Sequence, residues 1–169
     1  SLGYVEVNLC RDAEASGSFG PDFTQCVWEL ETLETTQRLG QHLAKQLPRG
    51  SILLLQGELG AGKTSLVQGL ALACGITEPI TSPTFALAQH YADGNPPLVH
   101  LDLYRLEDSG SADELFLQEE EEARALGALM AVEWPERLGL QLPEAWRLEL
   151  TYIQTGRRAQ LTPPKNAST

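Results

Sequence analysis

The sequence predicts an α/β domain with three layers and a mixed, partly parallel sheet. A short, continuously apolar strand is expected at residues 51–56, followed by a glycine-rich loop and by a helix from about 63 to 74. A strand that lacks alternation between apolar and polar residues is typical of a parallel sheet covered on both faces. Further strands, separated by a second acidic helix, complete the pattern of an α/β fold.

The other elements are predicted from apolar periodicity. Residues 26–30 favour a strand, and a helix with one apolar face follows to about residue 46. Its N-cap is expected at Thr32, with Thr35 or Thr36 as alternates. Alternation at 98–104 predicts a strand with apolar residues on one face and His100, Asp102 and Tyr104 on the other. The remaining expected elements are a helix at 111–126, a strand at 129–132, and a C-terminal antiparallel hairpin formed by 147–153 and 158–161.

Length and composition favour one domain. A chain of 169 residues is close to the usual size of a single domain. Residues 1–22 show little periodicity and are predicted to form a mobile leader, residues 23–162 the domain, and residues 163–169 a loose tail.

Charge, hydropathy and cysteine usage exclude several classes of protein. Lys and Arg total 12 against 23 Asp and Glu, so the net charge of −11 disfavours autonomous binding to nucleic acid. No apolar run approaches the roughly 18–20 residues of a membrane span. The three cysteines, Cys10, Cys26 and Cys74, lack C-x-x-C spacing, so neither a disulfide framework nor a zinc site is expected. This cysteine usage predicts a reducing compartment, the cytoplasm.

The glycine-rich loop carries the strongest chemical signal. Residues 57–64 read Gly-Glu-Leu-Gly-Ala-Gly-Lys-Thr and match G-x-x-x-x-G-K-[ST] in full. In such a loop the backbone N–H groups and the start of the following helix surround phosphate oxygens. Lys63 would reach the β- and γ-phosphates and the Thr64 hydroxyl would bind Mg²⁺. The sequence therefore predicts a P-loop NTPase-like domain that binds a nucleotide with Mg²⁺.

Two acids and a hydroxyl-rich loop extend the predicted site. Asp102 follows residues 99–101 on its predicted strand, and Glu133 ends the predicted strand at 129–132. One of the two acids could hold Mg²⁺ and the other could orient the attacking water. Which acid does which is left open. Thr84 belongs to a Thr-Ser-Pro-Thr loop after the P-loop helix, which is either a sensor of the γ-phosphate or an ordinary turn. His100 is interpreted as structural, and Trp134 as either a stacking or a core residue.

Four ordered segments resemble the TsaE (YjeE) family of bacterial ATPases that take part in threonylcarbamoyladenosine modification of tRNA. Besides the loop at 57–64, they are Thr-Ser-Pro-Thr-Phe at 81–85, His-Leu-Asp-Leu-Tyr-Arg-Leu at 100–106 and Glu-Trp-Pro-Glu at 133–136. The resemblance as a whole extends over about residues 32–158. The chain departs from the family pattern at 116–122, which is acidic and lacks an expected glycine, and in its long leader.

The resemblance implies a set of roles. ATP would be bound by Leu59, Gly60, Ala61, Gly62, Lys63 and Thr64. Lys63, Thr84, Asp102 and Glu133 would act in catalysis, with Thr64 and the two acids near Mg²⁺. Leu33 and the Gly156-Arg157 turn would approach the adenine. The protein would bind a TsaD–TsaB heterodimer and support its turnover, while TsaD would modify adenosine 37 of the tRNA.

Two other functions are considered. A small-molecule P-loop kinase would close an arginine-rich lid over the transferred phosphate, and this sequence has few basic residues and no basic cluster after the third strand. A nucleotide-gated interaction module with incidental hydrolysis is not excluded by the sequence. No arginine finger is obvious, and Arg105 is the nearest candidate, so hydrolysis is expected to be slow in the isolated protein and faster with partners.

Overall fold

The strands of the protein form one mixed sheet. The computed structural model describes residues 5–8, 26–83 and 87–165. Within these, eight strands are ordered β1-β2-β8-β7-β3-β6-β5-β4. Their bounds are β1 Val5–Asn8, β2 Val27–Leu30, β3 Ile52–Gln56, β4 Ala88–Tyr91, β5 Leu98–Asp102, β6 Leu129–Glu133, β7 Trp146–Ile153 and β8 Gly156–Thr162.

The sheet is parallel at its centre and antiparallel at both edges. Strand β3 pairs in parallel with β6 and β7, and β5 pairs in parallel with β6. The outer pairs β4–β5, β7–β8, β2–β8 and β1–β2 are antiparallel. The α/β fold, the partly parallel sheet and the C-terminal hairpin are therefore confirmed.

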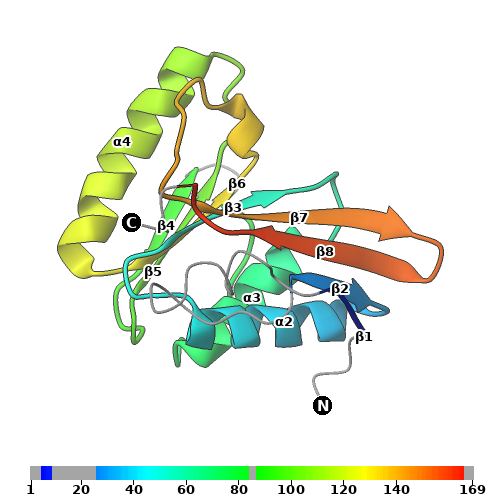
Figure 1. Ribbon diagram of the computed structural model, residues 1–169. Helices are drawn as coiled ribbons and strands as arrows, with labels where there is room; N and C mark the ends of the chain where they lie inside the picture. Colours follow the sequence, from blue (N-terminus) through cyan, green and yellow to red (C-terminus); the bar gives the residue numbers. More distant parts are fainter. Residues whose placement is uncertain (1–4, 9–25, 84–86, 166–169) are drawn as a thin grey trace.

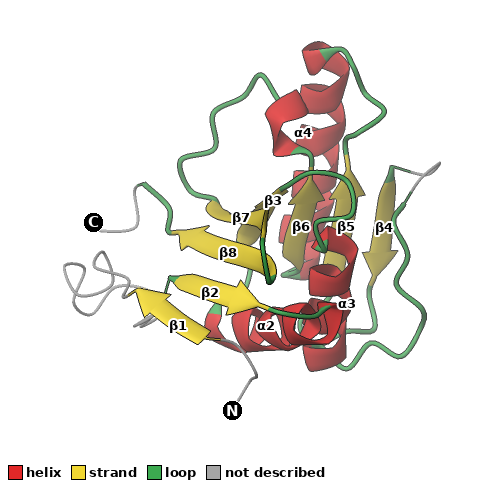
Figure 2. Ribbon diagram, turned by 90° about the vertical axis from the view of Figure 1, so that its right-hand side faces the viewer, coloured by secondary structure: helices red, strands yellow, loops and turns green. Residues whose placement is uncertain are grey.

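Helices cover both faces of the sheet, which makes three layers (Figures 1 and 2). Helices α2 (Leu33–Gln46) and α3 (Lys63–Ala73) lie on one face and α4 (Ser109–Leu126) on the other. Alternate residues of β3 supply the two cores: Leu53 and Leu55 pack on the α2–α3 side, and Leu54 packs on the α4 side. In the described part of the chain, no helix is both long and apolar enough to span a membrane.

Side chains in the sequence determine where the helices begin. At α2 the predicted N-cap is confirmed, because the Thr35 N–H donates to Thr32 Oγ1 and the Thr32 N–H donates to Thr35 Oγ1, each at 3.1 Å. Helix α4 starts two residues before its predicted start at 111. Asp108 caps it by accepting from the Ser111 N–H at 3.1 Å, a cap that apolar periodicity does not reveal.

Helices α2 and α3 cross with their backbones in contact. A Cβ atom at Gly40 would lie 2.2 Å from the Leu66 carbonyl oxygen, and one at Gly69 would lie 1.9 Å from the Gln37 carbonyl oxygen. Both neighbours are helix backbone and cannot rotate away. The start of α2 also lies beside the end of the glycine-rich loop, because a Cβ atom at Gly62 would lie 3.4 Å from Thr36 Cγ2.

Gly69→Ala is expected to lower the free energy of unfolding by about 1–3 kcal/mol, the usual cost of overpacking a core. The clash with backbone outweighs the roughly 1 kcal/mol by which alanine favours a helix over glycine. Urea unfolding of Gly69→Ala against Gly110→Ala measures the effect. Gly110 also lies in a helix, but a Cβ there meets only the Asp108 side chain, at 3.3 Å. Equal stabilities of the two variants would contradict the close crossing.

Three expectations about the rest of the chain are corrected. Strand β1 lies inside the predicted leader and pairs with β2, with Val5 opposite Glu29; four edge residues leave no periodic signal to find. Residues 9–22 lie outside the described residues. Cys26 is disulfide-bonded, so the expected absence of disulfides is not met, whereas Cys74 is free and buried. The predicted tail 163–169 is anchored at its start, where the Lys165 N–H donates to the Pro143 carbonyl at 2.8 Å.

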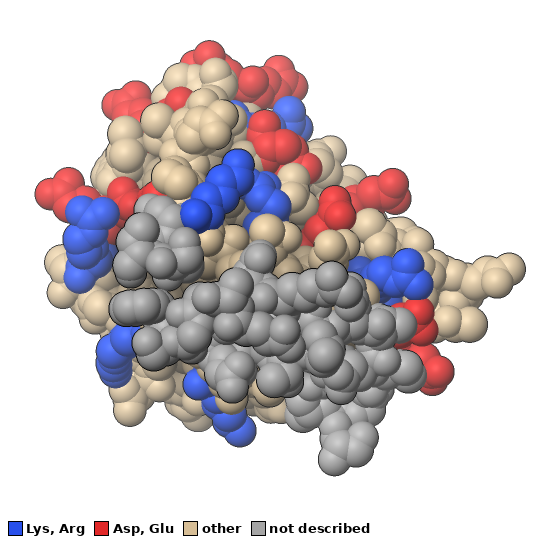
Figure 3. Space-filling view, viewed as in Figure 1, with Lys and Arg blue, Asp and Glu red and all other residues tan. Residues whose placement is uncertain are grey.

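Charged side chains are unevenly distributed on the face drawn in Figure 3. Asp and Glu side chains gather at the top, where α4 lies, and Lys and Arg side chains lie in small separate groups. Binding a nucleic acid backbone requires a continuous basic stripe. The described residues on this face form no such stripe.

Candidate functional site

The predicted site residues converge at one edge of the sheet. The loop at 57–64 follows β3, Asp102 ends β5 and Glu133 ends β6. These three strands are parallel neighbours, and the register places Asp102 opposite Glu133 and Glu133 opposite Leu55. The carboxyl ends of parallel strands are the usual place for a ligand in such sheets.

The sharp turn of the loop depends on two glycines. Gly60 has φ +80° and Gly62 has φ +107°, both in the left-handed region that other residues rarely adopt. Gly62 is the N-cap of α3, so the free N–H groups at the start of this helix face the end of the loop. Ala61 is fully buried, and its N–H donates to the Glu58 carbonyl at 3.0 Å, which closes the turn from inside.

The C-terminal hairpin supports the loop from outside. The Arg157 guanidinium donates from Nη2 to the Gly60 carbonyl at 3.1 Å, and the Tyr152 hydroxyl donates to the Leu59 carbonyl at 3.4 Å. Arg157 also lies 5.4 Å from the centre of the Tyr152 ring. These two bonds tie the loop to the hairpin and hold the Leu59 and Gly60 carbonyls in place.

Lys63 is buried in the loop. Its side chain is 5% exposed, its ammonium donates to the Gly57 carbonyl, and Nζ lies 4.0 Å from the centre of the Trp134 ring. Burial lowers the pKa of Lys63 below its ordinary value, while the negative charges of Glu133, Glu136 and Asp102 act in the opposite direction. The lysine is thus a desolvated cation held by one carbonyl and one aromatic face.

The two acids have different hydrogen-bond partners. Asp102 accepts from the Ser82 hydroxyl at 2.8 Å and from the Tyr104 N–H at 3.0 Å, one donor to each oxygen. The bond to Tyr104 turns the backbone out of the strand, which explains why β5 ends at Asp102 and not at the predicted 104. Glu133 is 3% exposed, and its Oε2 lies 2.6 Å from Nε2 of the fully buried His100.

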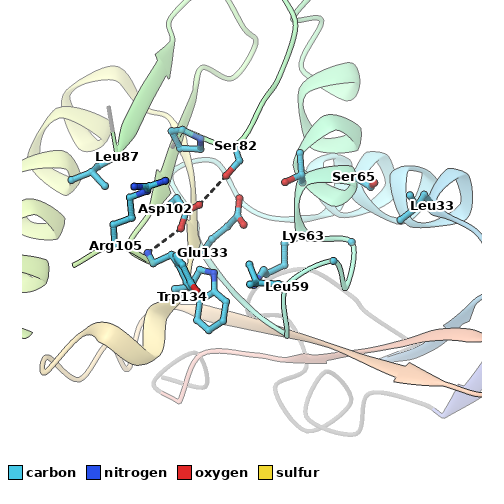
Figure 4. Close-up of a pocket in the computed structure, with 15 residues that line it drawn as sticks. Leu33, Leu59, Lys63, Ser65, Ser82, Leu87, Asp102, Arg105, Glu133 and Trp134 are labelled. Atoms are coloured by element: carbon cyan, nitrogen blue, oxygen red, sulfur yellow. Dashed lines mark hydrogen bonds between the residues drawn. The ribbon is translucent and has the colours of Figure 1, made fainter. Parts of the chain in front are cut away.

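These groups surround a cavity of about 430 Å³ between the strand ends and the start of α3 (Figure 4). Among the predicted site residues, those that line it are Leu33, Leu59, Gly60, Gly62, Lys63, Thr64, Asp102 and Glu133. In Figure 4 the Glu133 carboxylate points into the space between the strand ends and α3.

Three predicted site residues are not among those that line the cavity. Ala61 is part of the core. Gly156 begins β8, where a Cβ would lie 2.3 Å from the Leu30 carbonyl oxygen, so it packs against the chain just before α2. Thr84 lies outside the described residues.

Sequence patterns missed two contributors. The interpretation of His100 as merely structural left out its contact with Glu133, although its position two residues before Asp102 puts both side chains on one face of β5. Trp134 has φ +59° and is half-buried against the core on the α4 side of the sheet. Its ring lies 4.8 Å from that of Tyr104 in a tilted arrangement and 4.0 Å from Lys63 Nζ, so it also lines the site. The left-handed backbone conformation of a tryptophan cannot be predicted from the residues around it in the sequence.

The chemistry of the donors fits a magnesium nucleotide. Carboxylate and hydroxyl oxygens are the ligands that Mg²⁺ prefers, and the phosphates of a bound nucleotide usually supply the rest. In the described part of the chain, no group of three or more His, Cys, Asp or Glu side chains could hold a metal alone. The site therefore suits a metal ion that is bound together with a phosphate group. The two acids would lie near the metal, and the lysine and the free helix N–H groups would contact the phosphate.

Comparison with known proteins identifies the family. Residues 30–160, more than three-quarters of the chain, match the family model described as "Threonylcarbamoyl adenosine biosynthesis protein TsaE". This chain belongs to the TsaE family. The resemblance found in the sequence is therefore confirmed.

Individual TsaE relatives cover most of the chain. A Synechocystis protein named "tRNA threonylcarbamoyladenosine biosynthesis protein TsaE" is 53% identical over 68% of this chain and 72% of its own length. A Nostoc protein of the same name is 46% identical over 79% of this chain and 83% of its own length. The structure also resembles the crystal structure of Bacillus subtilis YdiB, with a TM-score of 0.65, 28% identity and coverage of 84% of this chain and 87% of that chain.

Proposed function

We propose that this TsaE-family protein binds and hydrolyses Mg-ATP as an accessory protein in the threonylcarbamoyladenosine modification of tRNA, where it supports the turnover of a TsaD–TsaB complex. One observation carries the proposal of hydrolysis: Lys63, Asp102 and Glu133 line a single cavity beside the N-terminus of α3. The tRNA pathway rests on the names of the relatives. We place the protein in the cytoplasm as part of this proposal, together with that pathway.

In this proposal the loop holds the phosphates. The Lys63 ammonium leaves the Gly57 carbonyl and binds phosphate oxygens, and the N–H groups of Thr64 and Ser65 at the start of α3 add positive dipole. Exchange of one neutral carbonyl for charged phosphate oxygens is favourable, because the ammonium then lies beside opposite charges in a desolvated site. Leu33 and Leu59, both exposed, border the cavity as apolar surface for the base.

The Thr64 hydroxyl and the Asp102 carboxylate would hold Mg²⁺, and Glu133 would accept a hydrogen bond from the attacking water. The bound ion would neutralise charge on the phosphate oxygens. Ser82 orients Asp102, so the loop that also contains Thr84 is linked to the proposed metal site. This link supports the expectation that the loop responds to the nucleotide.

Slow hydrolysis by the isolated protein is expected because the cavity has few cations. Of the described residues that line it, Lys63 and Arg105 are the basic ones, and Arg105 is exposed at the rim. An arginine supplied by a partner typically raises such rates by about 10³–10⁵-fold. A TsaD–TsaB complex that covers the cavity would supply charge or exclude water at this rim.

We expect phosphate release from Mg-ATP to be at least about tenfold faster when TsaD–TsaB is added, a conservative fraction of what a supplied arginine contributes. Single-turnover measurements of phosphate release, with and without the pair, test this. Unchanged rates would contradict activation by the partner. Phosphate transfer to a small metabolite would instead favour a kinase, and nucleotide-dependent binding to the pair without hydrolysis would favour an interaction module.

A further inference from the structure

We infer that His100 is a positioning residue for Glu133: it holds one carboxylate oxygen and thereby leaves the other directed into the cavity. The inference deepens the proposed function, because it assigns a role in hydrolysis to a residue outside the cavity lining. It rests on the geometry of one buried pair and on the charges around it.

The pair is formed by neighbouring strands. His100 lies on β5 opposite Ala131 of β6, and Glu133 follows two residues later on the same face of β6. Strand pairing therefore sets the distance between the two side chains, and Nε2 lies 2.6 Å from Oε2. The exposed fractions of the two side chains are 0% and 4%, so water does not compete for this bond.

Packing alone does not account for an imidazole at this position. Its Nδ1 is buried and has no hydrogen-bond partner among the described residues, which is unfavourable for a polar atom. A leucine of similar size would avoid that cost in the surrounding apolar core. The contact with Glu133 is thus the one polar interaction that the described chain gives to this ring.

Among the described residues, the orientation of the Glu133 carboxylate depends on a single donor, whereas that of Asp102 does not. Both oxygens of Asp102 have donors, from Ser82 and from the Tyr104 N–H. His100 is the one described donor that reaches the Glu133 carboxylate, so Oε1 is left for the cavity that Glu133 lines. A carboxylate held at one oxygen presents the other in a defined direction, which suits the orientation of a water molecule.

The same bond keeps Glu133 apart from Lys63. Both groups border one cavity and carry opposite charges, and the charge of Glu133 acts on the pKa of Lys63. Yet no salt bridge joins them in the described structure. His100 engages Glu133 while Gly57 and Trp134 engage Lys63. Without His100, Glu133 would turn toward the ammonium, and the two groups would neutralise one another.

Three substitutions separate positioning from packing. In His100→Gln the amide Nε2 can reach Glu133 and donate, in His100→Asn the shorter amide cannot, and His100→Leu has no donor. We expect kcat for Mg-ATP hydrolysis to fall about 10–100-fold in the Leu and Asn variants, the usual effect of losing an outer hydrogen bond at such a site. His100→Gln should keep most of the wild-type kcat, and the midpoint of thermal unfolding of His100→Leu should be at or above that of wild type.

Calorimetric titration with Mg-ADP gives a readout that is independent of turnover. The dissociation constant of Mg-ADP should change less than about threefold in His100→Gln. It should rise in His100→Leu, because a Glu133–Lys63 pair would compete with the phosphates for the ammonium. In a Glu133→Gln background, His100→Leu should cause no further loss of kcat, since the two residues act as one unit.

The outcomes distinguish this inference from the proposed function. Absence of ATP hydrolysis and of Mg-ADP binding in the wild-type protein would overturn the proposed function itself. A hydrolysing wild type with equal kcat in the Gln, Asn and Leu variants would overturn only the role of His100. If His100→Leu does not fold, the comparison of Gln with Asn decides: equal kcat values would overturn the role, and a higher kcat for Gln would support it.

Discussion

Lys63→Met is expected to lower the rate of Mg-ATP hydrolysis by at least about 10²-fold, the usual cost of removing one preorganised donor from a transition state. The ammonium lies at the junction of the loop and α3, beside both acids, and is the one buried cation among the described residues that line the cavity. Charged groups in a desolvated site act more strongly than they do in water. Methionine preserves most of the aliphatic stem, so the loss reports the charge.

The same substitution should not unfold the protein. Burial lowers the pKa of Lys63, which means that the folded chain disfavours the charged form relative to the unfolded chain. At neutral pH the group is below its ordinary pKa, so this cost is present, and it would disappear only above that pKa. Removing the charge relieves the cost, although it also removes the contacts with Gly57 and Trp134.

Thermal unfolding and calorimetric titration with Mg-ADP check this expectation. Lys63→Met should melt within a few degrees of wild type or higher and should show no heat of binding. Lys45→Met, at an exposed position near the end of α2, is the matched control and should bind as wild type does. Undiminished binding by Lys63→Met would refute the assignment of the loop as a phosphate site.

Glu133→Gln is expected to lower kcat by about 10²–10⁴-fold, the usual contribution of a positioned acid or base. The amide keeps the shape of the side chain and can accept from His100, so the geometry of the strand ends is maintained. It lacks the negative charge that strengthens a hydrogen bond from water. Affinity for Mg-ADP should change little or rise, because a negative charge that repels phosphate is removed.

Single-turnover hydrolysis, with affinity from calorimetry, measures the two effects separately. Glu121→Gln, at an exposed position on α4 far from the cavity, is the matched control and should match the wild-type rate. Asp102→Asn supplies the contrast: loss of a metal ligand should weaken the dependence on Mg²⁺ concentration as well as the rate. If Glu133→Gln requires more Mg²⁺ and Asp102→Asn does not, the roles proposed for the two acids are reversed.

The core of the fold could be predicted because its signals are local. The loop at 57–64 must combine glycines, Lys63 and Thr64 within eight positions, and the helix that follows completes its phosphate contacts. An apolar run such as that of β3 indicates burial on both faces, and Thr32 reveals the start of α2 through a bond to Thr35 three residues on. Glu133 was found because a predicted strand ends at it, and Asp102 because it follows the apolar residues of its strand.

The folded chain alone brings together groups that are distant in sequence. His100 reaches Glu133 across 33 positions, and Arg157 reaches Gly60 across 97. Neither contact leaves a pattern in the residues near it, since sheet order and register decide which side chains meet. The same holds for β1, for the contact of Gly69 with Gln37 and for the stacking of Lys63 on Trp134. Local propensity specifies the elements and the loop, whereas long-range packing decides which side chains surround the cavity.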